Sequence, residues 1–267
     1  MRLATKDLDR SHRTPHQTPH PIPQPTPLHV AFEEEIYAQA DRQLARSLSA
    51  ILLSFVLSGI ATLGCELNDQ HSRLLAIGDS VLDWNRDEGA SIPTIVGQRA
   101  QLEVMNESIS GSQVLDPSDE GIPQQYISGD WSWVLIDGGA NDVGDGCGCG
   151  ECMGQVNRII SPDASEGAMV SLVSRAVSDG AHVVLLGYYQ VSGSDFAGCE
   201  DEAEAINARY QALADRSPEV IFVNMSDAVS NEPMNVYLDE DGIHPSIYGG
   251  ELIGELIAQR IVEHEAR

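Results

Sequence analysis

A serine, an aspartate and a histidine in this chain are the residue types that nucleophilic hydrolysis requires. Ser80 follows the apolar run 74–77 and the turn Gly78-Asp79, and Asp241 precedes His244 by three residues. A histidine beside a serine hydroxyl can take its proton and so make the oxygen a nucleophile. A carboxylate three residues earlier on a tight loop can accept the histidine Nδ1–H, which leaves Nε2 free to act as the base.

Two further residues could stabilise the negative charge that such an attack creates on a carbonyl oxygen. Gly111 follows the second apolar run, and without a Cβ its backbone N–H can approach a ligand closely. Asn141 follows the third apolar run and could direct its side-chain NH₂ at the same oxygen. With the N–H of Ser80, these groups would form an oxyanion hole.

Each motif also has an ordinary structural explanation. Gly78-Asp79-Ser80 could cap a helix, and Gly111 could form a turn. Asn141 could bond to nearby backbone in a loop, and Asp241 with His244 could be a helix-cap cluster or a pair of metal ligands. A shared function therefore depends on whether the fold brings the four motifs to one place.

Short apolar runs that alternate with helical patterns determine the expected fold. Gly180 stands where a helix C-terminal glycine belongs, before the fourth run. Alternation of this kind predicts a three-layer α/β/α sandwich around a central parallel sheet of about five strands, with ligands bound beyond the carboxyl ends of the strands. We expect buried strands at 74–77, 102–105, 133–136, 182–186 and 220–223, and helices near 91–100, 165–179, 201–215 and 246–264.

In order and spacing, the four motifs resemble blocks I, II, III and V of the SGNH (GDSL-like) hydrolases. The resemblance covers roughly residues 72–265. Val81 replaces the leucine of the Gly-Asp-Ser-Leu motif, and Ala140 replaces a residue that is often Gly or Glu, but neither position supplies a catalytic atom. The matching residues are Gly78-Asp79-Ser80, Gly111, Gly139-Ala140-Asn141-Asp142 and Asp241-Gly242-Ile243-His244.

The resemblance implies a flavodoxin-like SGNH fold and a serine esterase that works through an acyl-enzyme without a metal or organic cofactor. It implies Ser80 as nucleophile, His244 as base and Asp241 as its orienting acid. The oxyanion hole would comprise the N–H groups of Ser80 and Gly111 and the side chain of Asn141. The expected substrates are small-molecule or glycan esters, either short-chain carboxylic esters or acetylated glycans.

Other functions share these residues or this fold. The alternatives are a lysophospholipase or thioesterase, an acyltransferase with the same triad, and a non-catalytic carbohydrate-binding surface lipoprotein. The intact triad argues against a binding protein, which has no need of all three residues. Trp84, Trp131 and Trp133 could stack on a sugar or lie in the core.

The charge of the chain excludes one class of partner. Residues 1–65 hold six basic and six acidic residues, so residues 66–267 carry the whole formal charge of −26. Because phosphate binding needs a basic surface, we expect no nucleic-acid partner and little affinity for anionic lipid. The sequence does not define the oligomeric state.

The N-terminal residues predict export. We expect a disordered Pro/His-rich extension at 1–45, a signal peptide, lipoprotein signal or membrane anchor at 46–65, and the hydrolase domain at 70–267. Thr62-Leu63-Gly64-Cys65 is similar to a bacterial lipoprotein cleavage site with lipid on Cys65, although Thr62 and Leu63 depart from the usual pattern. The protein would be periplasmic, an outer-membrane lipoprotein with a membrane tether, or secreted.

Four cysteines remain if Cys65 carries lipid. An even number in an exported protein favours two disulfides among Cys147, Cys149, Cys152 and Cys199. The alternative is a structural zinc site, which four cysteines would satisfy. The spacing lacks paired Cys-x₂-Cys knuckles, so disulfides are the preferred interpretation, with their connectivity open.

Overall fold

A computed structural model describes residues 73–267 of the chain. Expectations for residues 1–45, for 46–65 and for lipid on Cys65 lie outside the described residues. No helix within 73–267 has the length and apolar character needed to cross a bilayer.

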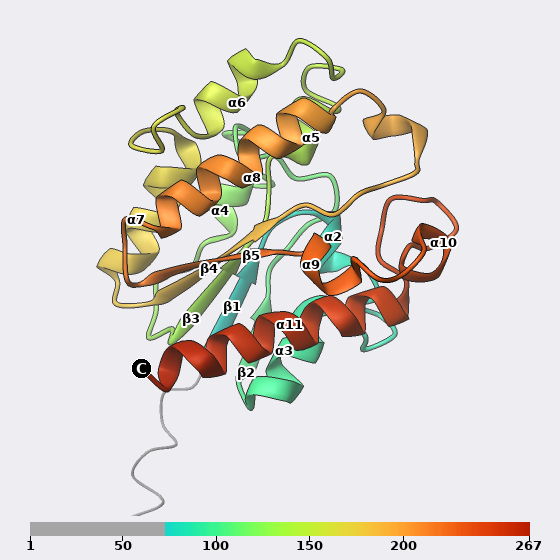
Figure 1. The fold of residues 1–267 in the computed structure, drawn as a ribbon. Helices are drawn as coiled ribbons and strands as arrows, with labels where there is room; N and C mark the ends of the chain where they lie inside the picture. Colours follow the sequence, from blue (N-terminus) through green and yellow to red (C-terminus); the bar gives the residue numbers. More distant parts are fainter. Residues whose placement is uncertain (1–72) are drawn as a thin grey trace, which may run out of the picture. The chain divides into compact units, whose positions relative to one another are not determined.

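Five strands and their connecting helices follow one another along the chain (Figure 1). The strands are β1 (Arg73–Ile77), β2 (Glu103–Asn106), β3 (Trp133–Ile136), β4 (His182–Gly187) and β5 (Val220–Asn224). The longer helices are α3 (Ile92–Ala100), α6 (Met153–Ile159), α7 (Ala168–Ser178), α8 (Glu200–Ala214) and α11 (Ile247–Glu265). The short ones are α2 (Ser80–Asp83), α4 (Ile122–Gln125), α5 (Ala140–Val143), α9 (Ser226–Val229), α10 (Met234–Tyr237) and the 3₁₀ turn η2 (Ser194–Phe196).

All strand pairs in the sheet are parallel, and the strand order is β2-β1-β3-β4-β5. The chain therefore leaves β1 toward one edge of the sheet for β2 and returns to the other side for β3. In an open α/β sheet, the crevice for ligands lies at the carboxyl ends of the strands where the order reverses. Here that point lies between β1 and β3, the two strands that precede Ser80 and Asn141.

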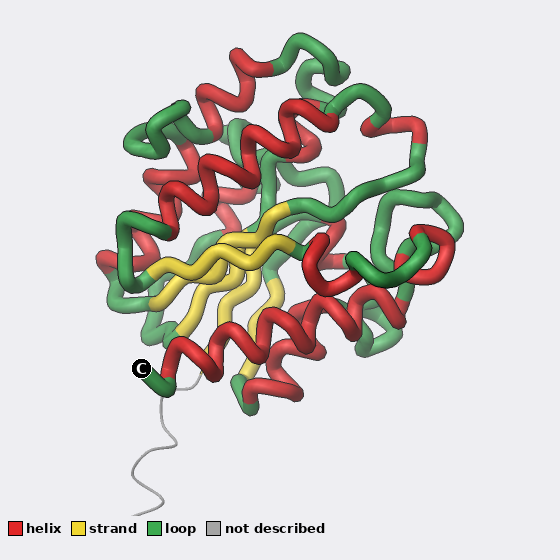
Figure 2. Tube along the Cα trace, viewed as in Figure 1, coloured by secondary structure: helices red, strands yellow, loops and turns green. Residues whose placement is uncertain are grey.

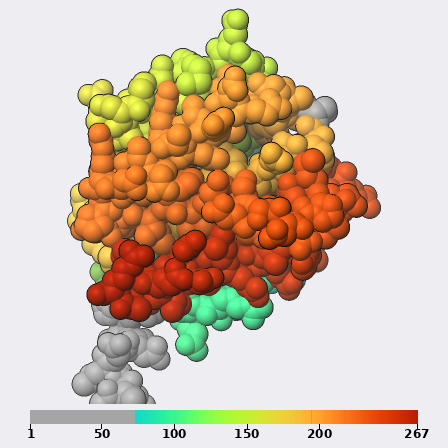
Figure 3. All heavy atoms as spheres, viewed as in Figure 1, coloured from blue at the N-terminus to red at the C-terminus, as the bar shows by residue number. Residues whose placement is uncertain are grey.

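Helices cover both faces of the sheet, so the expected three-layer α/β/α fold is confirmed (Figures 1 and 2). Side chains alternate along each strand. Leu74 and Ala76 pack in the cluster that includes Ile253 and Ile257 of α11, whereas Leu75 and Ile77 pack in the cluster on the opposite face. Side chains of α8 and α11, orange and red, cover much of the face seen in Figure 3.

The expected strands and the helices α3, α7, α8 and α11 match the structure to within a few residues, whereas α6 was not predicted. The four-residue helices were not predicted, because one turn is too short to show a helical period. Three of them, α2, α4 and α5, lie beside the candidate site, so the unpredicted elements matter most for its geometry.

The four cysteines form two disulfides, Cys147–Cys152 and Cys149–Cys199. Of the two alternatives left open by the sequence, the structure has the disulfide arrangement. The second disulfide joins the loop after α5 to the start of α8.

Candidate active site

The turn between β1 and α2 presents Ser80. Gly78 has no room for a side chain, because a Cβ there would collide with the carboxyl group of Asp137. Asp79 caps α2 by accepting a hydrogen bond from the Val81 N–H at 3.0 Å. Asp79 thus has the capping role that the sequence allowed. Ser80 is the first residue of the helix and stays accessible.

Ser80, His244 and Asp241 form one chain of hydrogen bonds. The Ser80 Oγ and His244 Nε2 atoms are 2.8 Å apart, and His244 Nδ1 and Asp241 Oδ2 are 2.6 Å apart. Asp241 Oδ1 also accepts the backbone N–H groups of Ile243 and His244, at 2.9 and 3.0 Å. Partial burial alone would raise the pKa of Asp241, but these hydrogen bonds outweigh it and hold that pKa below its ordinary value. The carboxylate is therefore ionised and orients the imidazole.

Trp84 contacts the triad from the side. Its indole ring lies against the His244 imidazole with centroids 3.9 Å apart and planes 9° apart. Trp131 and Trp133, by contrast, are buried in the core. Of the three tryptophans considered for sugar stacking, one is thus packed on the candidate base and two have structural positions.

Gly111 lies next to both α2 and Asn141. Its φ of 83° is a conformation that favours glycine. Ser110 on one side donates from Oγ to Asp83 Oδ2 at 2.6 Å, and the carbonyl of Ser112 on the other accepts from Asn141 Nδ2 at 3.0 Å. Within residues 73–267, neither the Gly111 N–H nor the Ser80 N–H has a hydrogen-bond acceptor, so both could bind a substrate oxygen.

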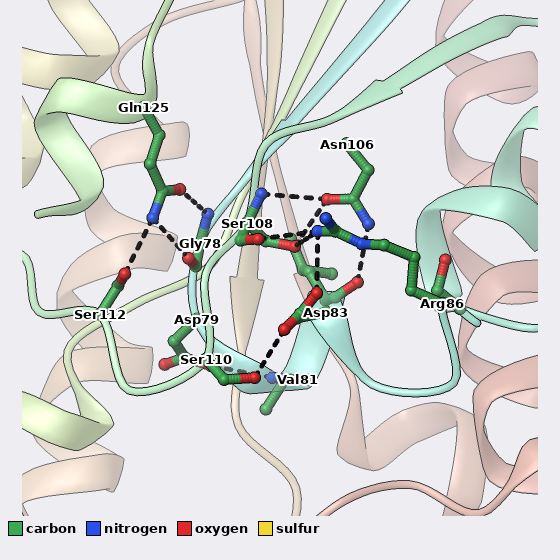
Figure 4. A network of polar contacts seen from close by, with 12 residues as sticks. Gly78, Asp79, Val81, Asp83, Arg86, Asn106, Ser108, Ser110, Ser112 and Gln125 are labelled. Atoms are coloured by element: carbon green, nitrogen blue, oxygen red, sulfur yellow. Dashed lines mark hydrogen bonds and ion pairs between the residues drawn. The ribbon is translucent and has the colours of Figure 1, made fainter. Parts of the chain in front are cut away.

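A polar network joins residues 108–112 to the turn at Gly78 through Gln125 and to the segment after α2 through Arg86 (Figure 4). Gln125 bonds through Oε1 to the Gly78 N–H at 2.7 Å, and its Nε2 reaches the Gly78 carbonyl and Ser112 Oγ. Arg86 donates to the carbonyl and Oγ of Ser108 at 2.7 and 2.9 Å. Sequence reasoning missed both residues, because neither lies in a motif.

Asp142 secures α5 to the same loop. Its buried carboxylate accepts the backbone N–H groups of Val114 and Leu115 at 2.9 and 2.8 Å. Asn141 is itself buried, with one amide hydrogen on Ser112 and the other available to a ligand. The structure therefore brings all five predicted site residues to one end of the sheet.

Two buried carboxyl groups lie beneath Ser80. Burial raises the pKa of Asp79 to about 6, an effect that the hydrogen bond from the Val81 N–H partly offsets. Burial, and then the charge of Asp79, raise the pKa of Asp137 well above its ordinary value. Because burial raises both pKa values and the charge of Asp79 raises that of Asp137 further, the pair resists carrying two negative charges at once. The Asp79 N–H also donates to Asp137 Oδ1 at 2.9 Å.

A cavity of about 890 Å³ opens beside the nucleophile. Ser80 and Asn141 line it, together with apolar side chains that include Val143, Phe196 and Ile206. Its volume lies within the range of small-molecule sites. Within residues 73–267, no cluster of three or more His, Cys, Asp or Glu side chains could hold a metal ion.

Residues 76–252 match the model of the GDSL-like lipase/acylhydrolase family. No curated protein matches the chain in sequence. Solved structures share the fold at low identity. A lipolytic protein of the G-D-S-L family from Desulfitobacterium hafniense is 18% identical, with a TM-score of 0.53 over 70% of this chain and 98% of its own.

Two further structures carry more specific names. The aryl esterase of M. smegmatis is 18% identical, with a TM-score of 0.53 over 72% of this chain and 99% of its own. A carbohydrate esterase family 2 enzyme from Corynascus thermopiles is 16% identical, with a TM-score of 0.52 over 73% of this chain and 67% of its own. At these identities the similarity shows the fold alone.

Proposed function

Because the chain belongs to the GDSL-like lipase/acylhydrolase family, we propose that it is a serine esterase that cleaves carboxylic esters through an acyl-enzyme. The observation that carries the proposal is the hydrogen-bond chain from Ser80 Oγ through His244 to Asp241. A general base on the hydroxyl and an orienting acid on the base are what an activated serine requires.

The reaction proceeds in two acyl transfers. His244 Nε2 takes the proton of Ser80 as Oγ attacks the ester carbonyl carbon. The N–H groups of Ser80 and Gly111 and the amide of Asn141 bind the resulting oxyanion. His244 then gives its proton to the departing alcohol oxygen, which leaves the acyl group on Ser80. Water, deprotonated by His244, releases the acid and restores the serine.

The decisive experiment is to replace Ser80 by alanine. We expect wild-type protein to hydrolyse p-nitrophenyl esters and to be labelled by a fluorophosphonate, and Ser80→Ala to lose both properties. Ser171→Ala is the matched control, because Ser171 is exposed on α7 and bonds only to its own helix. Activity or labelling that survives in Ser80→Ala would contradict the proposal.

The cavity bears on the substrate. Its lining includes Ser80 and Asn141 but neither His244 nor Gly111. Since the alcohol leaves toward His244, we infer that the cavity receives the acyl side of the scissile bond. We therefore place simple carboxylic esters ahead of acetylated glycans as substrates, because an acetyl group would leave most of this space empty. Glu200 and Glu204 on its lining disfavour anionic lysophospholipids.

Two isomeric esters test this assignment. Ethyl octanoate and octyl acetate have the same atoms but carry the long chain on opposite sides of the ester. We expect a higher kcat/KM for ethyl octanoate, and a preference for octyl acetate would instead support the acetyl-specific alternative. Product analysis with added alcohol distinguishes a hydrolase from an acyltransferase that uses the same triad.

We also propose that the protein is exported, as its N-terminal sequence predicts. The two disulfides support this location, because they persist in oxidising compartments. Cell fractionation with N-terminal sequencing tests the proposal and tells a lipidated Cys65 from a cleaved signal or an uncleaved anchor. Recovery of the full-length chain in the cytosol would contradict it.

A further inference from the structure

We propose that Trp84 is a positioning residue for His244 and that, with Asn85, it holds the loop 239–245 against α2. The inference rests on the proposed function, because it assigns to Trp84 a role in the proton transfers of that reaction. Neither residue belongs to a motif that suggested catalysis from sequence.

The stack of Trp84 on His244 differs from the other contacts between aromatic rings and histidine in residues 73–267. Trp133 lies 5.0 Å from His182 at 33° and 5.4 Å from His264 at 80°. The Trp84 and His244 rings are closer and nearly parallel, at 3.9 Å and 9°. In this arrangement the indole packs flat against one face of the imidazole and limits its rotation.

Polar contacts hold both residues to the loop that carries the triad acid and base. Trp84 Nε1 donates to Asp239 Oδ2 at 3.1 Å, and Asn85 Nδ2 donates to the Pro245 carbonyl at 3.1 Å. The two contacts thus reach opposite ends of the loop. Asn85 has a φ of 58°, an uncommon conformation for a residue with a side chain.

The position of the indole has a chemical consequence. His244 becomes an imidazolium in both acyl transfers, and an aromatic face attracts a cation, with Trp giving the strongest interaction. The attraction acts when the proton has moved to His244, which happens in the transition state and not in the substrate complex. Trp84 should therefore affect kcat more than KM.

Two substitutions at Trp84 separate the aromatic face from the rest of the side chain. We expect Trp84→Leu to lower kcat about tenfold with KM within about twofold of wild type. Trp84→Phe keeps an aromatic face and should recover most of that loss. The rate of fluorophosphonate labelling, which needs the same base, should fall in parallel with kcat. Trp131→Phe is the matched control, because Trp131 is buried away from the triad.

Asn85 offers a second test, which does not require the replacement of a large side chain. Asn85→Gly keeps the left-handed backbone accessible and removes only the contact with Pro245, so we expect a smaller loss of kcat, about threefold. Gln101→Gly is its control, since Gln101 has the same φ of 58° at the end of α3, and its activity should not change.

Specific outcomes overturn the inference. It fails if Trp84→Leu retains kcat within twofold of wild type, or if Trp84→Phe is as impaired as Trp84→Leu while both melt at the wild-type temperature. It also fails if the loss appears in KM alone. A wild-type protein that neither hydrolyses esters nor reacts with the fluorophosphonate would instead refute the proposed function.

Discussion

The two sides of the candidate site are built in different ways. On the triad side, Asp241 and His244 are three residues apart, and the loop closes on itself through the Leu238–Pro245 bridge. The Asp241 side chain is 34% exposed. On the oxyanion side, Asn141 and Asp142 are buried and bond to residues about thirty positions earlier in the chain.

This difference shows two solutions to the problem of holding polar groups in place. On the triad side the acid and the base come from one short segment, so their contact with each other is local, while long-range contacts from Trp84 and Asn85 hold that segment in place. Amide donors that must stay fixed while charge develops need support from the rest of the fold, here Gln125, Arg86 and Asp142. Three substitutions test the comparison.

The largest expected effect is on the triad side. Asp241→Asn should lower kcat by about 10⁴-fold, because an amide at this position donates to Nδ1 and leaves the proton on Nε2, the wrong tautomer for a base. Steady-state kinetics with the preferred ester measures the loss. Asp215→Asn, at the exposed end of α8, is the control. A loss below about tenfold would show that the exposed carboxylate does not set the tautomer.

A smaller effect is expected on the oxyanion side. Asn141→Ala should lower kcat by about 10²–10³-fold and change KM little, because the amide meets charge that develops in the transition state. Asn157→Ala, on the surface of α6, is the matched control. If KM rose instead while kcat held, Asn141 would bind the substrate and not the oxyanion.

The smallest effect is on the free energy of unfolding, which should depend on pH through the buried pair Asp79 and Asp137. Because the folded protein raises the pKa of Asp79 to about 6, the contribution of Asp79 to stability is fully present below about pH 4 and is lost as the pH rises through about 6. The raised pKa of Asp137 acts in the same direction. Asp137→Asn removes one of the two buried carboxyl groups that titrate. The free energy of unfolding should then fall less between pH 4 and 7 than in wild type.

Urea unfolding across this range measures the difference. Asp119→Asn is the control, because Asp119 is exposed and should leave the pH dependence of wild type unchanged. Parallel curves for wild type and Asp137→Asn would show that Asp137 does not contribute to the pH dependence of stability.

The strand runs, four of the five longer helices and the position of each motif could be predicted because they depend on local patterns. The apolar run at 133–136 gives β3 within its exact bounds, and Asp241-x-x-His244 describes a contact that is local in sequence. These signals depend on period and spacing, which a single sequence displays.

The supporting contacts could not be predicted, because they join residues that are far apart in the sequence. Gln125 reaches Gly78 across 47 residues, and Trp84 reaches Asp239 across 155. A glutamine in a four-residue helix has no pattern that marks it, and only the folded sheet brings these segments together. Ser80 and His244 are themselves 164 residues apart, so their contact was expected from the family resemblance and not from any local signal.

The two disulfides interleave, since Cys149 lies inside the ring that Cys147 and Cys152 close and pairs instead with the distant Cys199. Four cysteines allow three connectivities, and because three of these cysteines lie within six residues of one another, we expect some wrong pairs to form during oxidation. Maturation of the segment after Asn141 therefore depends on thiol–disulfide exchange. A host that supplies oxidant but no isomerase would produce a fraction of molecules with scrambled bridges beside an otherwise intact sheet.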